Sequence, residues 1–158
     1  EDGAVYSLGS GTLTILQGGE SELYNTDDSS AHVNNASLCT MFEAGSFRYL
    51  STGDAEAQAE QRLVDRYGKA LHATLFKAGH HGSSTSSTDA LLQVVQPQAA
   101  AISCGLNNDY GHPHARALQR LTAAGADIYR TDTMGTITFT YQNDTLTAAA
   151  TDTLDAAA

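Results

Sequence analysis

Apolar and polar side chains alternate with a period of two towards both ends of the chain, the pattern of β-strands with one buried face. In each case two such runs flank a short stretch of turn-forming residues, so the pattern predicts antiparallel hairpins. The predicted strand pairs are Val5–Leu8 with Thr12–Gln17, Ser37–Phe42 with Phe47–Ser51, and Thr136–Tyr141 with Thr145–Ala149. The polar stretch from Gly18 to Asn35 separates the first two hairpins and is predicted to be a long loop.

The middle of the chain alternates between helical and extended segments. From Ala55 to Tyr67, apolar residues such as Leu63 recur at helical spacing, with Glu60 among the polar residues largely off that stripe. The central strands are wholly apolar, as in strands that are buried on both faces. We therefore predict an α/β (α+β layered) fold, a mixed β-sheet with helices over one face. The other predicted segments are helices Thr88–Val95 and Pro113–Ala124 and strands Ala73–Lys77, Ala99–Cys104 and Asp127–Arg130.

Local signals mark the ends of these helices. Ser87 or Thr88 is expected to cap the second helix. Pro113 is expected at the first helical position of the third helix, where its missing N–H group is not needed. Gly68 and Gly125 follow the first and third helices, as glycine commonly does.

The size and charge of the chain restrict what it can do. Its 158 residues suffice for one domain, which we place at residues 1–150, with a disordered tail at 151–158. Eight Lys and Arg against 18 Asp and Glu give a net charge of −10. Such a chain repels a phosphate backbone, which excludes nucleic-acid binding through a basic face, although bound metal cations could reverse the sign locally. No apolar run approaches the ~20 residues that a membrane span requires.

Three groups of polar residues follow predicted strands, and the first is Ser51-Thr52-Gly53-Asp54-Ala55-Glu56. Asp54 could simply be the N-cap of the next helix, accepting its amide hydrogen bonds. Alternatively, its carboxylate is held at the C-terminal edge of a strand, where α/β proteins place their ligands. The pattern leaves both interpretations open.

The second group, Gly79-His80-His81-Gly82-Ser83-Ser84, follows the strand that ends at Lys77. Adjacent histidines between glycines are rarely core residues, and the glycines let the backbone approach a ligand closely. Neutral imidazole is also the commonest side-chain metal ligand. The two histidines are therefore predicted to be functional, whereas Ser83 and Ser84 could donate hydrogen bonds to an anion or simply be solvated.

The third group ends in Tyr110-Gly111-His112-Pro113-His114 and follows the strand that ends at Cys104. Asn108, Asp109 and Pro113 could be ordinary turn and helix-entry residues. The imidazoles of His112 and His114 could instead contact a phosphate group or a metal. If the three strands are neighbours, all three loops converge on one edge of the sheet.

These groups and their surroundings resemble the ComEC-type metallo-β-lactamase domain, in order and with family-like gaps. The resemblance covers the chain from about Asn34 to Tyr141. The segments that carry it are Asn34-Asn35-Ala36-Ser37-Leu38, Phe47 to Leu50, Thr52-Gly53-Asp54-Ala55-Glu56, Leu75-Phe76-Lys77-Ala78-Gly79-His80-His81-Gly82-Ser83, Tyr110-Gly111-His112-Pro113-His114 and Arg130-Thr131-Asp132.

The resemblance implies an αββα sandwich, of which this chain is the second half, and metal-dependent hydrolysis with zinc or manganese in a two-metal site. The ComEC branch is linked to DNA uptake in bacterial competence, and its domain is thought to act as a nuclease on phosphodiesters. On that pattern Asp54 and His80 are the expected catalytic residues. Asp54 would bridge the metals, with His80 or His81 as the histidine ligand. The residues expected near the substrate phosphate are Ser83, His112 and His114.

The resemblance is incomplete, because the family's principal metal motif, His-x-His-x-Asp-His, is absent from this sequence. Asp54 and one histidine supply only two of the roughly three protein ligands that a catalytic zinc needs. We therefore expect weak or no metal binding and little activity unless the missing N-terminal half of the domain joins the chain. The alternatives are a non-catalytic, truncated or degenerate binding domain, and a metallo-hydrolase of the same fold that acts on esters or lactams.

The resemblance also sets the expected partners and location. DNA or another phosphodiester is the expected substrate of the full-length protein. Membrane segments upstream and a place on the extracellular face of the bacterial membrane follow if the chain is part of a ComEC protein; otherwise it would be secreted or cytoplasmic. The open sheet face should be covered by the missing half, by a second copy in a homodimer, by strand swapping, or by the hairpin Val5–Gln17. Residues expected on that face are alternate strand residues such as Leu38, Phe47, Tyr49, Phe76 and Ile102, or their neighbours.

Overall fold

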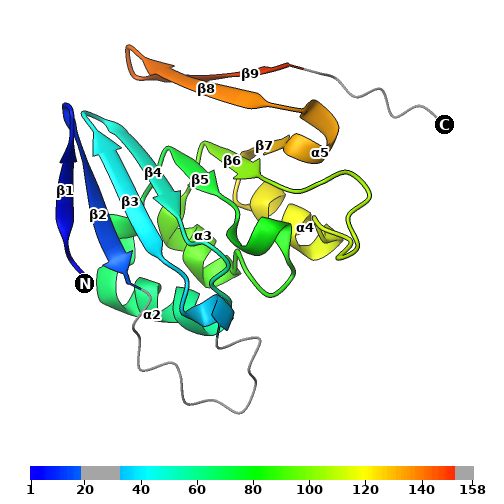
Figure 1. Ribbon diagram of the computed structural model, residues 1–158, viewed down its shortest axis with the longest axis horizontal. Coiled ribbons are helices and arrows are strands. Elements are labelled where there is room, and N and C mark those ends of the chain that lie inside the picture. Colours follow the sequence, from blue (N-terminus) through cyan, green and yellow to red (C-terminus); the bar gives the residue numbers. More distant parts are fainter. Residues whose placement is uncertain (19–32, 152–158) are drawn as a thin grey trace.

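The computed structural model describes residues 1–18 and 33–151 (Figure 1). Most of the predicted loop Gly18–Asn35, and nearly all of the predicted tail, lie outside these residues. Seven strands form one sheet, in which their spatial order is their order along the chain. Neighbours from β1 to β4 are antiparallel and those from β4 to β7 are parallel. The strands are β1 Val5–Leu8, β2 Gly11–Gln17, β3 Cys39–Ala44, β4 Phe47–Ser51, β5 Leu75–Lys77, β6 Ala99–Ile102 and β7 Asp127–Arg130.

Helices connect the parallel strands, and the three longest lie against one face of the sheet (Figure 1). They are α2 Ala57–Tyr67, α3 Asp89–Val95 and α4 Ala115–Ala123, with a 3₁₀ turn at Gly68–Leu71 and a short α5 at Thr131–Met134. This mixed sheet with helices on one face confirms the predicted α+β layered fold. Within the described residues, no helix has the length and apolar character needed to cross a membrane.

The core lies between the sheet and these helices. Leu50, Phe76 and Ile102 are completely buried and pack in one cluster with Leu63 of α2 and Leu91 of α3. Each large apolar side chain buried in this way stabilises the fold by about 1.5–3 kcal/mol. The expectation that Phe76 and Ile102 line the open face is wrong. Phe76 pairs with Leu50 in the register of β4 and β5, so it points to the helices, and Ile102 packs in the same cluster.

The opposite face of the sheet is partly covered by the C-terminal hairpin, which Figure 1 shows on the side away from the helices. The rings of Tyr129 and Phe139 lie 5.2 Å apart between centroids, and those of Phe47 and Tyr141 lie 5.1 Å apart. The expectation that the N-terminal hairpin covers this face is wrong, because β2 pairs with β3 and extends the sheet sideways. The covering hairpin consists of β8 Ile137–Gln142 and β9 Thr145–Ala150.

The start of one helix is confirmed and that of another differs from the prediction. Thr88 caps α3 as predicted, with its side-chain oxygen accepting the N–H group of Leu91 at 3.4 Å. Pro113 is not the first helical residue, because α4 begins at Ala115 with His114 as its N-cap. The backbone N–H of His114 donates to the Gly82 carbonyl at 2.9 Å, which ties the chain to the second polar loop before the helix begins.

Candidate functional site

The three polar groups lie together at one edge of the sheet. Strands β4, β5 and β6 are parallel neighbours, so their carboxyl ends meet at the same edge. Asp54 follows β4, His80 and His81 follow β5, and the loop with His112 and His114 follows β6. The predicted convergence of these residues is confirmed, because close ring contacts among the histidines and the 3.6 Å approach of the His81 Nε2 to the Asp54 Oδ1 connect all of them.

Asp54 lies in a turn that the backbone can make only with a small residue before it. Gly53 has a φ of +58°, and a Cβ atom there would come within 2.8 Å of the Ser37 Cβ. The N–H of Asp54 donates to the Ser37 hydroxyl at 2.9 Å, which fixes the turn. Asp54 is not an N-cap, because α2 begins three residues later with Glu56 as its cap residue. The Asp54 carboxylate is therefore free of helix capping and faces the histidines.

His80 and His81 both adopt a left-handed backbone, with φ values of 47° and 54°. Residues other than glycine rarely do so, and such strain is typical of functional segments. The surroundings leave little freedom, since a Cβ atom at Gly82 would lie 2.7 Å from the Pro113 Cβ. The N–H of His80 also donates to the carbonyl of Gly53 at 3.0 Å, which joins the first two polar groups.

The two histidines have different partners. The Nδ1 of His81 lies 2.7 Å from the Ser103 carbonyl oxygen, so Nδ1 carries the proton and the lone pair of the neutral ring is on Nε2. That Nε2 lies 3.6 Å from the Asp54 Oδ1. The Nδ1 of His80 lies 3.7 Å from the Glu56 Oε1 and 3.5 Å from the Thr85 hydroxyl. His81, and not His80, is therefore the neighbour of Asp54.

His112 lies at the centre of the imidazole group. Its ring centroid is 5.5 Å from that of His80, 4.7 Å from that of His114 and 6.4 Å from that of His81, to which it is nearly parallel. Burial lowers the pKa of His112, as do the nearby His114, His80 and His81, while Asp54 opposes this shift. His112 is thus a neutral, partly buried imidazole near neutral pH.

His114 is held on both sides by the backbone. Its Nδ1 accepts the N–H of Ser84 at 2.9 Å, so its Nε2 carries the proton and donates to the Tyr110 carbonyl at 3.1 Å. Both nitrogens of a neutral ring are then occupied. The arrangement suits a residue that joins the second and third loops better than one that donates to a substrate.

Ser83 is buried, with only 4% of its surface exposed. Its hydroxyl lies 3.0 Å from the hydroxyl of Thr85, and its N–H donates to the His80 carbonyl at 2.8 Å. These contacts place Ser83 inside the turn that follows the histidines.

Glu60 of α2 supports the second loop, a role that the hydrophobic pattern of the sequence does not predict. Its carboxylate is completely buried and accepts the N–H groups of Ser87 at 2.6 Å and Thr88 at 2.8 Å. Burial raises the pKa of Glu60, and the hydrogen bonds from Thr88 and Ser87 offset part of this rise. The expected position off the apolar stripe is wrong. The signal was present, because Glu60 precedes Leu63 and Tyr67 by three and seven residues and so shares their helix face.

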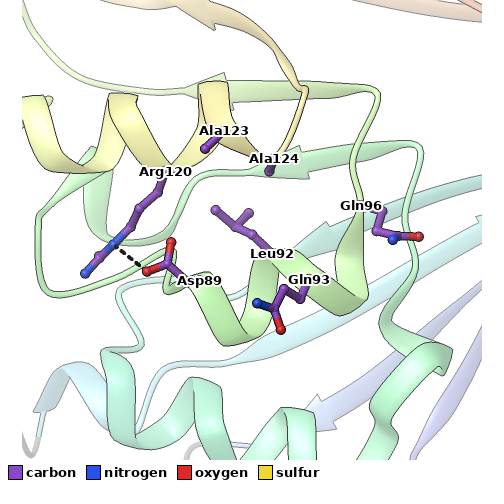
Figure 2. Close-up of a pocket in the computed structure, with 7 residues that line it drawn as sticks. All are labelled: Asp89, Leu92, Gln93, Gln96, Arg120, Ala123 and Ala124. Carbon is purple, nitrogen blue, oxygen red and sulfur yellow. Dashed lines mark ion pairs between the residues drawn. The ribbon is translucent and has the colours of Figure 1, made fainter.

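Arg120 holds the same loop from the side of α4. Its Nη1 donates to the carbonyls of Ser84 at 3.0 Å and Ser86 at 3.1 Å. Its Nε lies 3.9 Å from the Asp89 carboxylate, and Figure 2 shows the two side chains facing each other at one end of a surface pocket of about 390 Å³. This pocket lies between α3 and α4, and none of the four histidines lines it.

The donor atoms at the sheet edge suit a metal in kind but not in number. Asp54 offers a carboxylate, and the His81 Nε2 offers a lone pair while its Nδ1 is held by a carbonyl, which is the usual arrangement of a metal-binding histidine. Within the described residues, however, no group of three His, Cys, Asp or Glu side chains is close enough to hold a metal ion. The part of the chain that the structure describes thus offers two ligands where a catalytic zinc uses about three.

Comparison with known proteins relates the chain to competence proteins. No protein-family model matches it. ComE operon protein 3 of Bacillus subtilis is 40% identical over 113 residues, which are 72% of this chain and 14% of that protein. Competence protein ComA of Neisseria gonorrhoeae is 38% identical over 75% of this chain and 16% of its own length. Recombination protein 2 of Haemophilus influenzae is 34% identical over 72% of this chain and 14% of its own length.

The chain therefore spans only 14 to 16% of the length of these curated relatives. The predicted resemblance to competence proteins is confirmed in this form, whereas the metallo-β-lactamase fold stays a prediction. The chain is homologous to a short segment of much longer bacterial proteins, which include a protein of the ComE operon and a competence protein.

Proposed function

We propose that this chain forms one side of a metal-dependent phosphodiesterase site that acts on DNA during competence. The observation that carries the proposal is the pairing of the Asp54 carboxylate with the His81 Nε2 at 3.6 Å. Two such groups at the carboxyl edge of parallel strands could bind one divalent cation, zinc or manganese, between them. The competence names of the relatives support DNA as the substrate.

The geometry favours His81 over His80 as the metal ligand. The hydrogen bond from its Nδ1 to the Ser103 carbonyl keeps the Nε2 lone pair directed towards Asp54. His80 is turned towards Glu56 and Thr85 instead. In this proposal His80 and His112 lie beside the substrate phosphate, and His114 positions the loop that carries His112.

A phosphodiester is the substrate class that best explains why a metal is needed here. The chain carries a net charge of −10, and the Asp54 carboxylate adds to the repulsion of any anion at this edge. A bound cation would reverse that local sign and could polarise a phosphoryl oxygen. Since the described residues offer only two ligands, we propose that protein residues beyond them complete the coordination of the metal. The isolated chain would then turn over little or no substrate.

The location follows from the same proposal. The relatives are about seven times longer than the segment that they share with this chain. We propose that the chain acts beside membrane segments of such a protein, on the extracellular side of the bacterial membrane, where incoming DNA would reach it.

Titration of the chain with Mn²⁺ or Zn²⁺ by calorimetry tests the proposal. Weak binding is expected in the native chain and none in Asp54→Asn or His81→Gln. His72→Gln is the matched control, because His72 lies three residues before β5, at the strand end opposite the site, and its Nδ1 is bonded to the Val95 carbonyl. Equal binding by the native chain and Asp54→Asn would overturn the proposal, and nanomolar affinity would show that further ligands exist.

The substrate class is tested by ligand binding in the presence of Mn²⁺. A labelled oligonucleotide should bind the native chain only when the metal is added, and Asp54→Asn should remove the effect. Binding of a phenyl ester or a β-lactam without binding of the oligonucleotide would favour the alternative of a hydrolase for esters or lactams.

A further inference from the structure

A small cavity adjoins the histidine group on the side of the third loop. It has a volume of about 220 Å³ and is lined by His81, Cys104, Gly105, Asn108, Tyr110 and His112. This volume is below the roughly 300–1,000 Å³ of pockets that hold drug-sized ligands. The cavity, here called the Tyr110 pocket, therefore suits a small flat group and not a whole nucleotide.

Tyr110 is the most unusual residue of this pocket. It is 78% exposed, although a large aromatic ring usually covers apolar surface or is itself covered. Its ring stacks on His112, with centroids 5.6 Å apart and planes 20° apart. His112 is in turn nearly parallel to His81, at 17° and 6.4 Å. The rings of His81, His112 and Tyr110 thus form a nearly parallel row that extends from the Asp54–His81 pair to the solvent-exposed Tyr110.

The loop is held in this arrangement by its own contacts. The Asn108 side-chain amide donates to the carbonyls of Gly105 at 2.9 Å and His112 at 2.6 Å, and its oxygen accepts the N–H of His112 at 3.0 Å. His112 is therefore fixed as a stacking partner before any ligand arrives. Preorganisation of this kind lowers the entropic cost of binding.

We infer that the Tyr110 pocket binds one unpaired base of a single-stranded nucleic acid, stacked on Tyr110, while the adjoining phosphate lies at the Asp54–His81 pair. This inference rests on the proposed function and specifies its substrate. Stacking on exposed aromatic rings is the general means by which proteins hold single strands. A base in a duplex is already stacked and paired, so it would have to be flipped out to enter.

The pocket offers little with which to distinguish one base from another. Both N–H groups of the Asn108 amide are occupied by Gly105 and His112, and the Nδ1 of His81 is occupied by Ser103. Stacking, which every base can provide, is then the main contribution, and binding should tolerate any sequence. Stacking is also an attraction that the net charge of −10 does not oppose, unlike contacts to phosphate.

The test uses a short single-stranded oligonucleotide with one 2-aminopurine, whose fluorescence is quenched by stacking, and a matched strand with an abasic site in its place. Both are titrated with the chain in the presence of Mn²⁺. Tyr110→Ala should weaken binding of the base-containing strand about tenfold and remove the quenching, and Tyr110→Phe should retain both. Leu106→Ala is the control, since Leu106 is exposed in the same loop and does not line the pocket.

The outcomes distinguish failure of the base pocket from failure of the proposed phosphodiester site. Tighter binding of the base-containing strand than of the abasic strand, lost in Tyr110→Ala and kept in Leu106→Ala, supports the inference. Equal binding of both strands, or no effect of Tyr110→Ala, overturns the base pocket and leaves the phosphodiester site standing. Failure of the native chain to bind either strand overturns both. Tighter binding of a duplex than of the single strand would also overturn the base pocket.

Discussion

The loops that follow β5 and β6 carry two histidines each, but they are held in different ways. The first is supported by the core, since the buried Glu60 accepts two N–H groups of its serine-rich continuation and Arg120 donates to two of its carbonyls. The loop after β6 is held by the amide of its own Asn108, by Thr131 at its base, and through His114, whose N–H donates to the Gly82 carbonyl and whose Nδ1 accepts the N–H of Ser84. The loop after β5 is therefore fixed in place when the helices pack, whereas the loop after β6 can be altered with little effect on the core.

This difference suits the proposed roles. A metal ligand must be placed to within about half an ångström, which requires a rigid support. The loop with Tyr110 is preorganised for its ligand mainly by the Asn108 amide, with few contacts to the core. The comparison predicts that substitutions of the residues that support the loop after β5 are costly to folding, whereas those in the loop after β6 affect mainly ligand binding.

The largest effect is expected for Glu60→Ala. The substitution leaves the buried N–H of Ser87 and the partly buried N–H of Thr88 without their acceptor, so the free energy of unfolding should fall by about 2–4 kcal/mol. Urea unfolding measures this, with Gln61→Ala as the control, because Gln61 is exposed on the same helix. A loss no greater than that of the control would show that the core does not hold the loop after β5.

A smaller loss is expected for Thr131→Val. The Thr131 hydroxyl accepts the N–H of Cys104 at 3.0 Å and donates to its carbonyl at 2.8 Å, and valine keeps the shape without these bonds. The free energy of unfolding should fall by about 1–2 kcal/mol. Thr133→Val, at an exposed position of the same short helix, should change it little. Identical unfolding midpoints for the two variants would contradict the anchoring role.

Asn108→Ala should alter stability by only about 1 kcal/mol, because the amide lies near the surface and its partners can turn to water. Its effect should instead be seen in ligand binding, because the loop loses its fixed arrangement. Asn108→Ala should bind a single-stranded oligonucleotide more weakly than the control Asp109→Ala, which alters an exposed residue of the same loop. A stability loss as large as that of Glu60→Ala would break the proposed contrast between the two loops.

The smallest effect is a pH dependence at the base of the loop after β6. Hydrogen bonds from Arg130 lower the pKa of Asp132 below its ordinary value of 3.8. The ion pair therefore contributes stability above that value, which is lost as the pH falls through the lowered pKa. Melting temperatures between about pH 6 and pH 3 should fall less steeply in Asp132→Asn than in the native chain or in Asp127→Asn. Parallel curves for all three would exclude this contribution.

The sequence predicted the elements well and their surroundings less well. The strands from Val5 to Arg130 were found close to their observed bounds, because period-two patterns and turn residues act locally. The burial of Glu60 and the direction of Phe76 were missed, because both depend on which face each element turns to its neighbours. Which face is buried depends on contacts between residues far apart in the chain, so the local sequence carries only a weak signal of it.

For the candidate site, the sequence by itself identified Asp54 and the four clustered histidines, since loops after neighbouring parallel strands must meet at one edge. It could not assign their partners. Only the tertiary structure turns the Nε2 of His81 to Asp54, ties both nitrogens of His114 to backbone, and exposes Tyr110 on the face of His112. The physical reason is that residue type and spacing decide which loops can meet, whereas ring orientation depends on hydrogen bonds to the backbone of the loops themselves. Those partners, Ser103 and Ser84 among them, become neighbours only when the sheet has formed.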